Sequence, residues 1–207
     1  MQYTVTEVYR SEYRIKGSKF LSFISNSETS ADTERFLASI KNEHPTATHH
    51  CYACLLNPND PAEIVSDDGE PNGTAGLPIL NTMKSAGLIN TLIVVVRYYG
   101  GTKLGKSGLI EAYSTAADMA IQCAELKRIV PILKVRVGYR YENQSFINKL
   151  KNDYPLIEMN ANYNESVELV LGIPKKTIGE VTAKLKAAEH LLLCLEEVGE
   201  SFYILQD

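Results

Sequence analysis

The sequence predicts an α+β protein built from two domains, residues 1–128 and 129–207. The second half alternates apolar and polar residues in the order strand, helix, strand, strand, helix, strand. The first half mixes strands and helices in a different order, and the pattern changes near residues 126–131. The 207 residues are 44% hydrophobic and 22% charged, which is typical of soluble globular proteins and leaves enough apolar side chain for folded cores.

The first domain is predicted to mix strands and helices. The run Leu92–Val96 is apolar throughout, so we expect a strand that is covered on both faces. Pro78 is suited to the first turn of a further helix, because its missing N–H is not needed there. In chain order the predicted strands are 3–9, 19–25, 47–56 and 92–96, and the main helices are 31–43 and 109–124.

The second domain is predicted to be ferredoxin-like, a β-α-β-β-α-β unit with two helices on one face of a four-stranded antiparallel sheet. Leu133, Val135 and Val137 alternate with polar residues, as in a strand with one buried face. Two later alternating runs flank the turn Asn164-Glu165 and predict a hairpin. In chain order the elements are 131–139, 143–151, 157–163, 167–173, 175–189 and 198–205. No catalytic residue types cluster here, which favours a packing or docking role.

The charge distribution argues against a protein that coats nucleic acid through bulk charge. The net charge is −4, with 12 basic and 14 acidic residues before residue 131 and 9 and 11 after it. Such proteins need an excess of Lys and Arg, so only a local basic patch stays open. No apolar run approaches the roughly 20 residues of a membrane span. The first residues lack a signal-peptide pattern, so we expect a cytoplasmic protein without membrane association.

Four cysteines raise the question of metal binding: Cys51, Cys54, Cys123 and Cys194. Cys51 and Cys54 form a C-x-x-C sequence next to His49 and His50, which resembles half of a zinc site. In a strand, however, side chains alternate, so these two thiols point to opposite faces. No second ligand pair follows. We therefore expect reduced thiols packed as small apolar groups, and no bound metal.

Carboxylates and glycines gather between residues 66 and 76. Asp67, Asp68 and Glu70 could hold a hard cation such as Mg²⁺ or orient a donor group. A solvated turn explains the same composition, because Asp-Gly and Asn-Gly favour turns and Pro71 ends a strand. Chemistry alone favours the turn.

A glycine-rich segment, residues 97–108, follows the predicted buried strand and leads into a helix. Glycines let backbone N–H groups approach a ligand closely, and a helix N-terminus adds partial positive charge. With Arg97, Lys103 and Lys106, this segment predicts an anion-binding cradle. Gly100 to Ser107 also fits G-x-x-x-x-G-K-[ST], the P-loop pattern of nucleotide-binding proteins.

The P-loop interpretation has two weaknesses. A P-loop usually opens a parallel α/β domain, whereas this segment lies near the end of the first domain. The next predicted strand, 132–139, does not end in the Asp that a Walker B strand would supply. A Mg-dependent nucleotide hydrolase, with Lys106 on the phosphates and Ser107 on Mg²⁺, is therefore kept as an alternative.

Several stretches resemble the signatures of the Impact (YigZ-type) family. The two longer ones are residues 66–80 and 97–105, and the shorter ones are His49–Ala53 and Gly17–Phe20. The resemblance covers most of residues 15–120, and the pattern of the second domain is similar to that of bacterial members.

The resemblance implies an N-terminal domain like one shared by a small-subunit ribosomal protein and an elongation factor, and a second domain similar to part of elongation factor G. Eukaryotic relatives are implicated in translational control, and ribosome or nucleic-acid binding is the usual inference for bacterial members. The sequence departs from the family at Ser107, where glycine is common, and at Glu111, where arginine is common. The first departure makes the P-loop match resemble a coincidence, and the second weakens a phosphate-binding role of the following helix.

We therefore expect a binding protein that acts in translation and contacts the ribosome or structured RNA, with no catalytic residues and no cofactor. The predicted nucleic-acid or anion-binding residues are Arg97, Tyr98, Gly100, Gly101, Lys103, Gly105 and Lys106. Tyr98 or Tyr99 could stack on a base. The residues predicted to line an adjoining polar cleft are His49, Asp67, Asp68, Glu70 and Thr74. The alternatives are the nucleotide hydrolase and a protein–protein docking scaffold.

Overall fold

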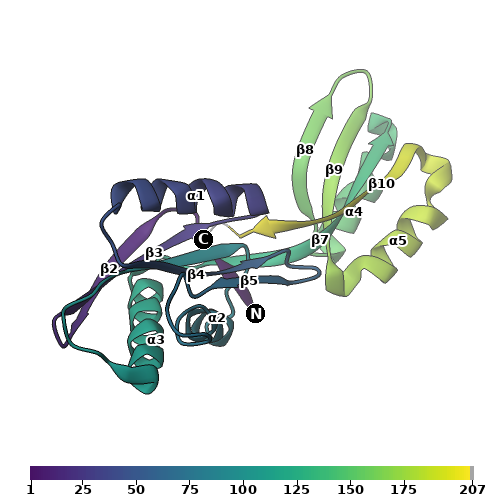
Figure 1. Ribbon diagram of the computed structural model, residues 1–207. Coiled ribbons are helices and arrows are strands. Elements are labelled where there is room, and N and C mark those ends of the chain that lie inside the picture. The colour runs from purple at the N-terminus through teal and green to yellow at the C-terminus, as the bar shows by residue number, and fades with distance from the viewer. Residues whose placement is uncertain (206–207) are drawn as a thin grey trace. The chain divides into compact units, whose positions relative to one another are not determined.

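A computed structural model describes residues 1–205, which form two compact units, Met1–Ile129 and Val130–Leu205 (Figure 1). The boundary between the units falls inside a strand, β7 (Lys127–Tyr139). Within the described residues there are two five-stranded sheets and five α-helices, so the structure is mixed α+β, as predicted.

The sheet of unit 1 is antiparallel, with the strand order β2-β3-β6-β4-β5. Its strands are β2 (Tyr9–Ile15), β3 (Ser18–Asn26), β4 (His49–Leu56), β5 (Ala62–Ser66) and β6 (Thr91–Tyr98). The central strand, β6, is fully buried from residue 91 to residue 96. The apolar run in the sequence predicts this position, because only a central strand is covered on both faces.

Helices cover both faces of this sheet. On one face lies α1 (Ser30–Glu43), and on the other lie α2 (Gly76–Ser85) and α3 (Gly105–Cys123) (Figure 1). A capping box fixes the start of α1, since Thr29 Oγ1 accepts from the Asp32 amide at 3.1 Å and Asp32 Oδ2 accepts from the Thr29 amide at 3.0 Å. These two bonds satisfy amides that a helix N-terminus leaves free.

The strand predicted over residues 3–9 is wrong. The chain instead forms β1 (Gln2–Thr4), which pairs with residues 127–129 at the start of β7, and then bends before β2 begins at Tyr9. β1 ends at Thr4, and the bend lies at residues 6–7. The two strands have different partners, since β1 pairs with β7 and β2 pairs with β3, so one continuous strand cannot serve both. The prediction also lacks β5 and most of β2, the two edge strands of the sheet.

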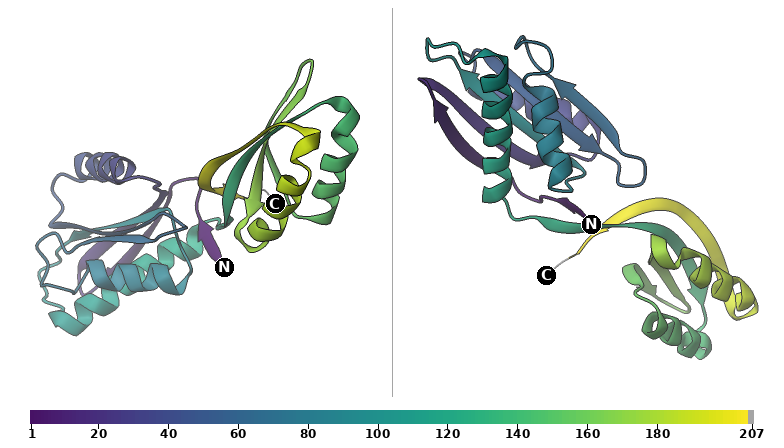
Figure 2. Two further views of the ribbon diagram at one scale, coloured as in Figure 1. Left: turned by 90° about the vertical axis from the view of Figure 1, so that its right-hand side faces the viewer. Right: turned by 90° about the horizontal axis from the view of Figure 1, so that it is seen from below.

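Unit 2 follows the predicted element order, β-α-β-β-α-β. Its elements after β7 are α4 (Gln144–Asp153), β8 (Ile157–Tyr163), β9 (Val167–Pro174), α5 (Ile178–Ala187) and β10 (Leu192–Ile204). The strand order is β8-β9-β7-β10. Both helices pack on one face of the sheet (Figure 2), where Ile147 and Leu150 of α4 and Val181 and Leu185 of α5 are buried in one core. The last strand, β10, begins at Leu192, six residues earlier than the predicted start at residue 198.

None of the helices within residues 1–205 is both long enough and apolar enough to cross a bilayer.

Candidate functional site

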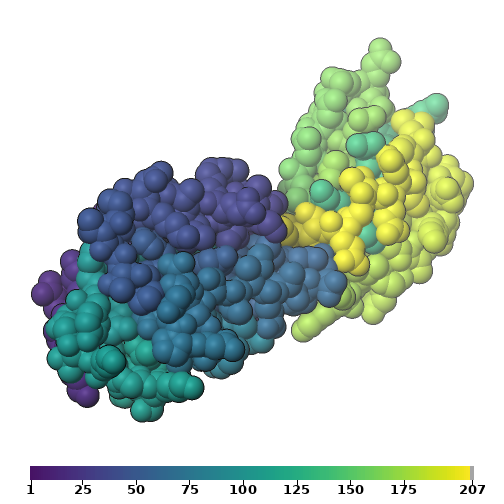
Figure 3. All heavy atoms as spheres, in the orientation of Figure 1, coloured from purple at the N-terminus to yellow at the C-terminus, as the bar shows by residue number. Residues whose placement is uncertain are grey.

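Three polar segments of unit 1 meet at one end of its sheet. They are the β2–β3 turn, the turn between β5 and α2, and the loop of residues 99–104 between β6 and α3, which we call the glycine loop. Gly17 in the first turn lies against Gly100, and Glu70 in the second turn binds Arg97 at the end of β6. The acidic and glycine-rich segments that the sequence singles out therefore converge. The space-filling view shows the teal surface of α3 and the preceding loop exposed at this end of the unit (Figure 3).

A buried ion pair lies beneath the glycine loop. Arg97 Nη1 donates to Glu70 Oε1 at 2.6 Å, and only 6% and 4% of the two side chains are exposed. The hydroxyl of Tyr113 on α3 donates to the same carboxylate oxygen at 2.9 Å, and Arg97 Nη2 donates to Ser18 Oγ at 3.3 Å. Within the described residues, Arg97 Nε is buried without a hydrogen-bond partner. The pair with Glu70 is thus the main compensation for burying the guanidinium charge.

This geometry corrects the prediction that Arg97 meets a phosphate. A phosphate contact needs an accessible cation, but the guanidinium is enclosed and already neutralised by Glu70. The cause is the position of Arg97 on β6, two residues beyond Val95 on the same face of the central strand. Burial raises the pKa of the Tyr113 hydroxyl well above its ordinary value, with Cys51 and Glu70 adding to the shift. Tyr113 therefore stays protonated and serves as a fixed donor to Glu70.

His49 and Asp68 join the cluster from the start of β4 and the acidic turn. His49 Nδ1 donates to the Asp68 carbonyl at 2.7 Å, and its Nε2 lies 3.8 Å from Glu70 Oε1. The Asp68 carboxylate accepts from the backbone amide of His50 at 2.6 Å and lies 4.0 Å from the ammonium of Lys41. Four of the five residues predicted to line a polar cleft, His49, Asp67, Asp68 and Glu70, are thus near one another, but they chiefly bind protein groups.

Asp67 and Thr74 have internal roles in the acidic turn. The Asp67 carboxylate accepts from the amides of Gly73 at 2.8 Å and of Ala75 and Gly76 at 2.9 Å. Burial opposes its ionisation, but these three bonds lower the pKa of Asp67 below its ordinary value of 3.8. Thr74 is buried and donates to the Pro71 carbonyl at 2.6 Å. Both side chains hold the turn against the start of α2, so their polar groups bind within the turn instead of lining the predicted polar cleft.

Replacing Asp67 with asparagine should destabilise the protein at neutral pH by about 1–3 kcal/mol. The amide cannot accept from all three N–H groups, and its NH₂ would face a donor. Because the pKa of Asp67 is lowered on folding, its contribution to stability is present above pH 3.8 and is lost as the pH falls through the folded-state value. Urea unfolding of the parent and D67N between pH 3 and pH 7 measures this loss of stability. A stability difference that is the same at pH 3 as at pH 7 would contradict the carboxylate role.

The two cysteines of the C-x-x-C sequence point to opposite faces of β4, as predicted. Cys51 Sγ donates to the Asp67 carbonyl at 3.0 Å and lies 3.3 Å from the Tyr113 hydroxyl, whereas Cys54 Sγ lies 3.3 Å from Thr33 Oγ1 on the α1 face. Burial raises the pKa of the Cys51 thiol to about 12. A buried thiol with a raised pKa stays protonated at neutral pH, so Cys51 serves as a packing residue with one S–H donor.

The glycine loop combines a tightly packed start with an open end. Gly100 packs against Gly17, and its amide donates to Ser18 Oγ at 3.3 Å, so this N–H is not available to a ligand. Gly101 and Gly105 have positive φ angles of 87° and 71°, and nothing lies within 4 Å of a β-carbon placed on either one. Lys103 and Lys106 are exposed beside them at the start of α3. Only the second half of the loop thus agrees with the predicted cradle.

The two tyrosines at the end of β6 face opposite sides of the sheet. Tyr98 is partly buried against the core under α1, and its hydroxyl hydrogen-bonds His44 Nδ1 at 3.0 Å. Tyr99 is 46% exposed and lies on the same face as Arg97, whose guanidinium carbon is 5.5 Å from the ring centroid. The predicted binding residue is Tyr98, but the accessible ring is that of Tyr99. Side chains alternate along a strand, so Tyr98 shares a face with the buried Val96 and Tyr99 lies on the other face. The same count along the sequence could have distinguished the two tyrosines.

The acidic residues do not complement the P-loop pattern. In the described part of the chain, no group of three or more His, Cys, Asp or Glu side chains is arranged to hold a metal ion. The carboxylates of Asp67 and Glu70 are occupied by backbone amides and by Arg97. Lys106 and Ser107 are exposed in the first turn of α3, so nothing observed favours the nucleotide hydrolase over a simple basic loop.

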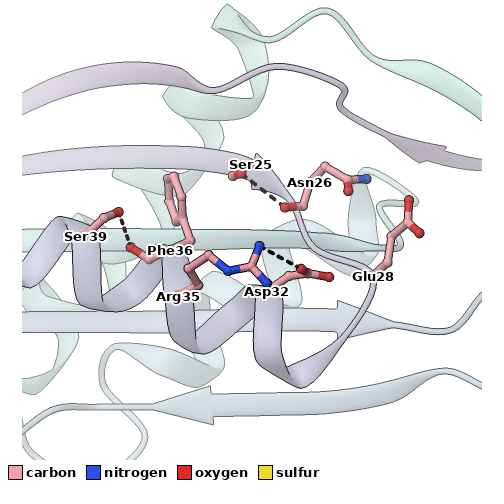
Figure 4. A pocket seen from close by; sticks show the side chains of 7 residues that line it. All are labelled: Ser25, Asn26, Glu28, Asp32, Arg35, Phe36 and Ser39. Carbon is pink, nitrogen blue, oxygen red and sulfur yellow. Dashed lines mark hydrogen bonds and ion pairs between the residues drawn. The ribbon is translucent and has the colours of Figure 1, made fainter.

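A separate hollow of about 530 Å³ opens along α1 on the opposite face of the sheet (Figure 4). Its polar groups bind one another, since Arg35 Nη1 lies 3.4 Å from Asp32 Oδ1 and Ser39 Oγ donates to the Phe36 carbonyl at 2.7 Å. Burial and the neighbouring Asp32 carboxylate raise the pKa of Glu28 in this hollow. It shares no residue with the cluster around Arg97 and is not part of the candidate site.

Comparisons with known proteins show the family to which the chain is related. The family model described as the Impact N-terminal domain matches residues 16–121. A protein of Haemophilus influenzae described as an IMPACT family member is 35% identical over 193 residues, which cover 91% of this chain and 94% of that protein. The IMPACT family member YigZ of Escherichia coli is 34% identical over 188 residues, or 88% and 92% of the two chains. A solved structure described as a hypothetical protein has 28% identity and a TM-score of 0.65, covering 97% of this chain and 98% of its own.

Proposed function

Because the chain belongs to the Impact family, we propose that it is a binding protein that acts in the cytoplasm in the regulation of translation, rather than an enzyme. Its partner is the ribosome or structured RNA, contacted through the open half of the glycine loop. The observation that carries this proposal is a group of exposed lysines around that loop: Lys16, Lys103 and Lys106.

The three lysines come from two segments that the fold brings together. Lys16 precedes Gly17, and Gly17 is so close to Gly100 that a β-carbon on it would lie 2.8 Å from the Gly100 carbonyl oxygen. Lys103 and Lys106 follow in the loop and in the first turn of α3. None of them takes part in an ion pair within residues 1–205. Free ammonium groups beside a helix N-terminus attract phosphate.

The rest of the cluster supports binding rather than catalysis. The groups that could act on a substrate are bound to other protein groups: Glu70 accepts from Arg97 and Tyr113, and the Cys51 thiol donates to the Asp67 carbonyl. A rigid scaffold that presents a loop of cations fits a binding protein.

We also propose that the units act as the two domains 1–128 and 129–207, the first resembling a domain of a ribosomal protein and an elongation factor, the second ferredoxin-like. The element order of unit 2 and its strand order β8-β9-β7-β10 support the second assignment.

Reversing two charges should weaken ribosome and RNA binding in a salt-dependent manner. In K103E/K106E, the slope of log affinity against log salt should fall by about 0.7–0.9 for each lysine that meets a phosphate. The control K149E/K186E makes the same change in net charge on exposed helix positions of unit 2 and should bind like the parent. Sedimentation with purified ribosomes and titration of labelled RNA at about 50 and 200 mM salt measure this.

The proposal fails if the parent protein stays wholly in the supernatant at low salt and binds no RNA. Equal losses in the two double variants would also contradict it, because they would indicate a bulk-charge effect without a defined site.

A further inference from the structure

We propose that Tyr99 is a preformed stacking platform for an unpaired base, so that the ligand at the glycine loop is single-stranded RNA or an exposed loop of a folded RNA. This inference rests on the proposed function and names the class of nucleic acid that the site selects. It is carried by a stack of three side chains that ends at the surface.

The stack consists of Phe20, Arg97 and Tyr99. The guanidinium carbon of Arg97 lies 5.4 Å from the centroid of the Phe20 ring and 5.5 Å from that of the Tyr99 ring. Below it, Phe20 is fully buried and meets the ring of Tyr113 edge to face, with 5.2 Å between centroids. The stack therefore runs from the core under α3 outward to an exposed aromatic ring.

Each layer of this stack is held in place by other contacts. Arg97 is fixed by Glu70 at 2.6 Å and by Ser18 at 3.3 Å. The backbone of Tyr99 is fixed where its amide donates to Thr48 Oγ1 at 3.1 Å. A ring that is already supported loses little conformational entropy when it binds, which favours affinity. Tyr99 nevertheless keeps 46% of its surface exposed, enough to receive a second flat group.

A supported, exposed ring beside cations favours single strands over duplexes. In a double helix both faces of each base are covered by its neighbours, so sequence-tolerant stacking on an aromatic side chain requires a base that is unstacked. Lys16 and Lys103 are exposed in the segments that join at Gly17 and Gly100, where they can meet the phosphates of a strand. Tyr98 cannot replace Tyr99, because its ring lies under Lys19 and its hydroxyl binds His44.

The first experiment compares RNA forms and tyrosine variants in the full chain. Labelled, unstructured RNA of about ten nucleotides is titrated alone and annealed to its complement. Y99A should weaken binding of the single strand by about 5- to 150-fold, the range expected for one base–aromatic stack, and should leave duplex binding nearly unchanged. Y99F keeps the ring and should bind like the parent. Y98F, which keeps a ring at the neighbouring position, is the matched control and should also bind like the parent.

A second readout reports stacking directly. The chain contains no tryptophan, so Y99W introduces a single indole at the platform. Its fluorescence should be quenched by the single strand and not by the same strand with abasic sites. If Y99A fails to fold, this variant alone decides the question.

The outcomes separate the two proposals. If Y99A binds the single strand like the parent, or if the indole is not quenched, Tyr99 is not a stacking platform. In that case the proposed function still stands if K103E/K106E loses binding. If neither single strand nor duplex binds the parent, and ribosomes do not either, both proposals fail.

Discussion

Replacing Gly100 with alanine is expected to abolish the folded state of unit 1 or to destabilise it by more than about 4 kcal/mol. A β-carbon on Gly100 would lie 1.8 Å from the Gly17 carbonyl carbon, 2.1 Å from its oxygen and 2.2 Å from the Ser18 nitrogen. All three are backbone atoms of the β2–β3 turn, so no rotamer change relieves the overlap. The glycine loop and this turn would have to separate.

Gly101 offers a matched control in the same loop. Nothing lies within 4 Å of a β-carbon on Gly101, so G101A is penalised only for its φ of 87°, at about 1–2 kcal/mol. Soluble yield and urea unfolding of the two variants measure the difference. If G100A unfolds at the same urea concentration as the parent, Gly100 does not pack closely against Gly17 and Ser18 in the protein.

Replacing Glu70 with leucine should reduce the free energy of unfolding by about 3–5 kcal/mol. The substitution leaves the Arg97 guanidinium buried at 6% exposure without its carboxylate and removes the acceptor of the Tyr113 hydroxyl. A buried charge that loses its partner keeps its desolvation penalty, and this makes the loss much larger than for a surface ion pair.

The double variant E70L/R97M tests whether the loss comes from the stranded charge. Removing both charges should restore much of the stability, so the double variant should be more stable than E70L alone. Urea unfolding of the parent, both single variants and the double variant gives the coupling free energy. Additive effects of the two substitutions would show that the ion pair does not hold the loop.

Periodic patterns in the sequence predicted the elements that bury a clear face. The alternation of Leu133, Val135 and Val137 gave β7, and the apolar run 92–96 gave the central strand β6. The edge strands were harder, for a physical reason. On β2 the exposed side chains are Arg10, Glu12 and Arg14 and the inner ones are only half-buried, because an edge strand needs less apolar surface than a central one.

The candidate site was predicted in its parts but not in its arrangement. The sequence identified the acidic turn, His49 and the glycine loop, and these meet in the structure. It could not show that Glu70 neutralises Arg97, because that depends on two segments 27 residues apart folding against the same end of the sheet. If the predicted strand 92–96 is extended by one residue, Arg97 becomes part of the buried strand. Tyr99, two residues later, then lies at the end of the same face of the sheet.

The hydrogen bond between Asp67 and Gly73 also affects the chemical degradation of the protein. Asn-Gly sequences are the most prone to spontaneous deamidation, in which the main-chain nitrogen after the asparagine attacks the side-chain amide and closes a succinimide ring. Asn72 is exposed and precedes Gly73, but the Gly73 nitrogen donates to Asp67 Oδ2 at 2.8 Å. A nitrogen held in that bond is poorly placed to attack, so the folded turn resists a chemical lesion to which its sequence is prone.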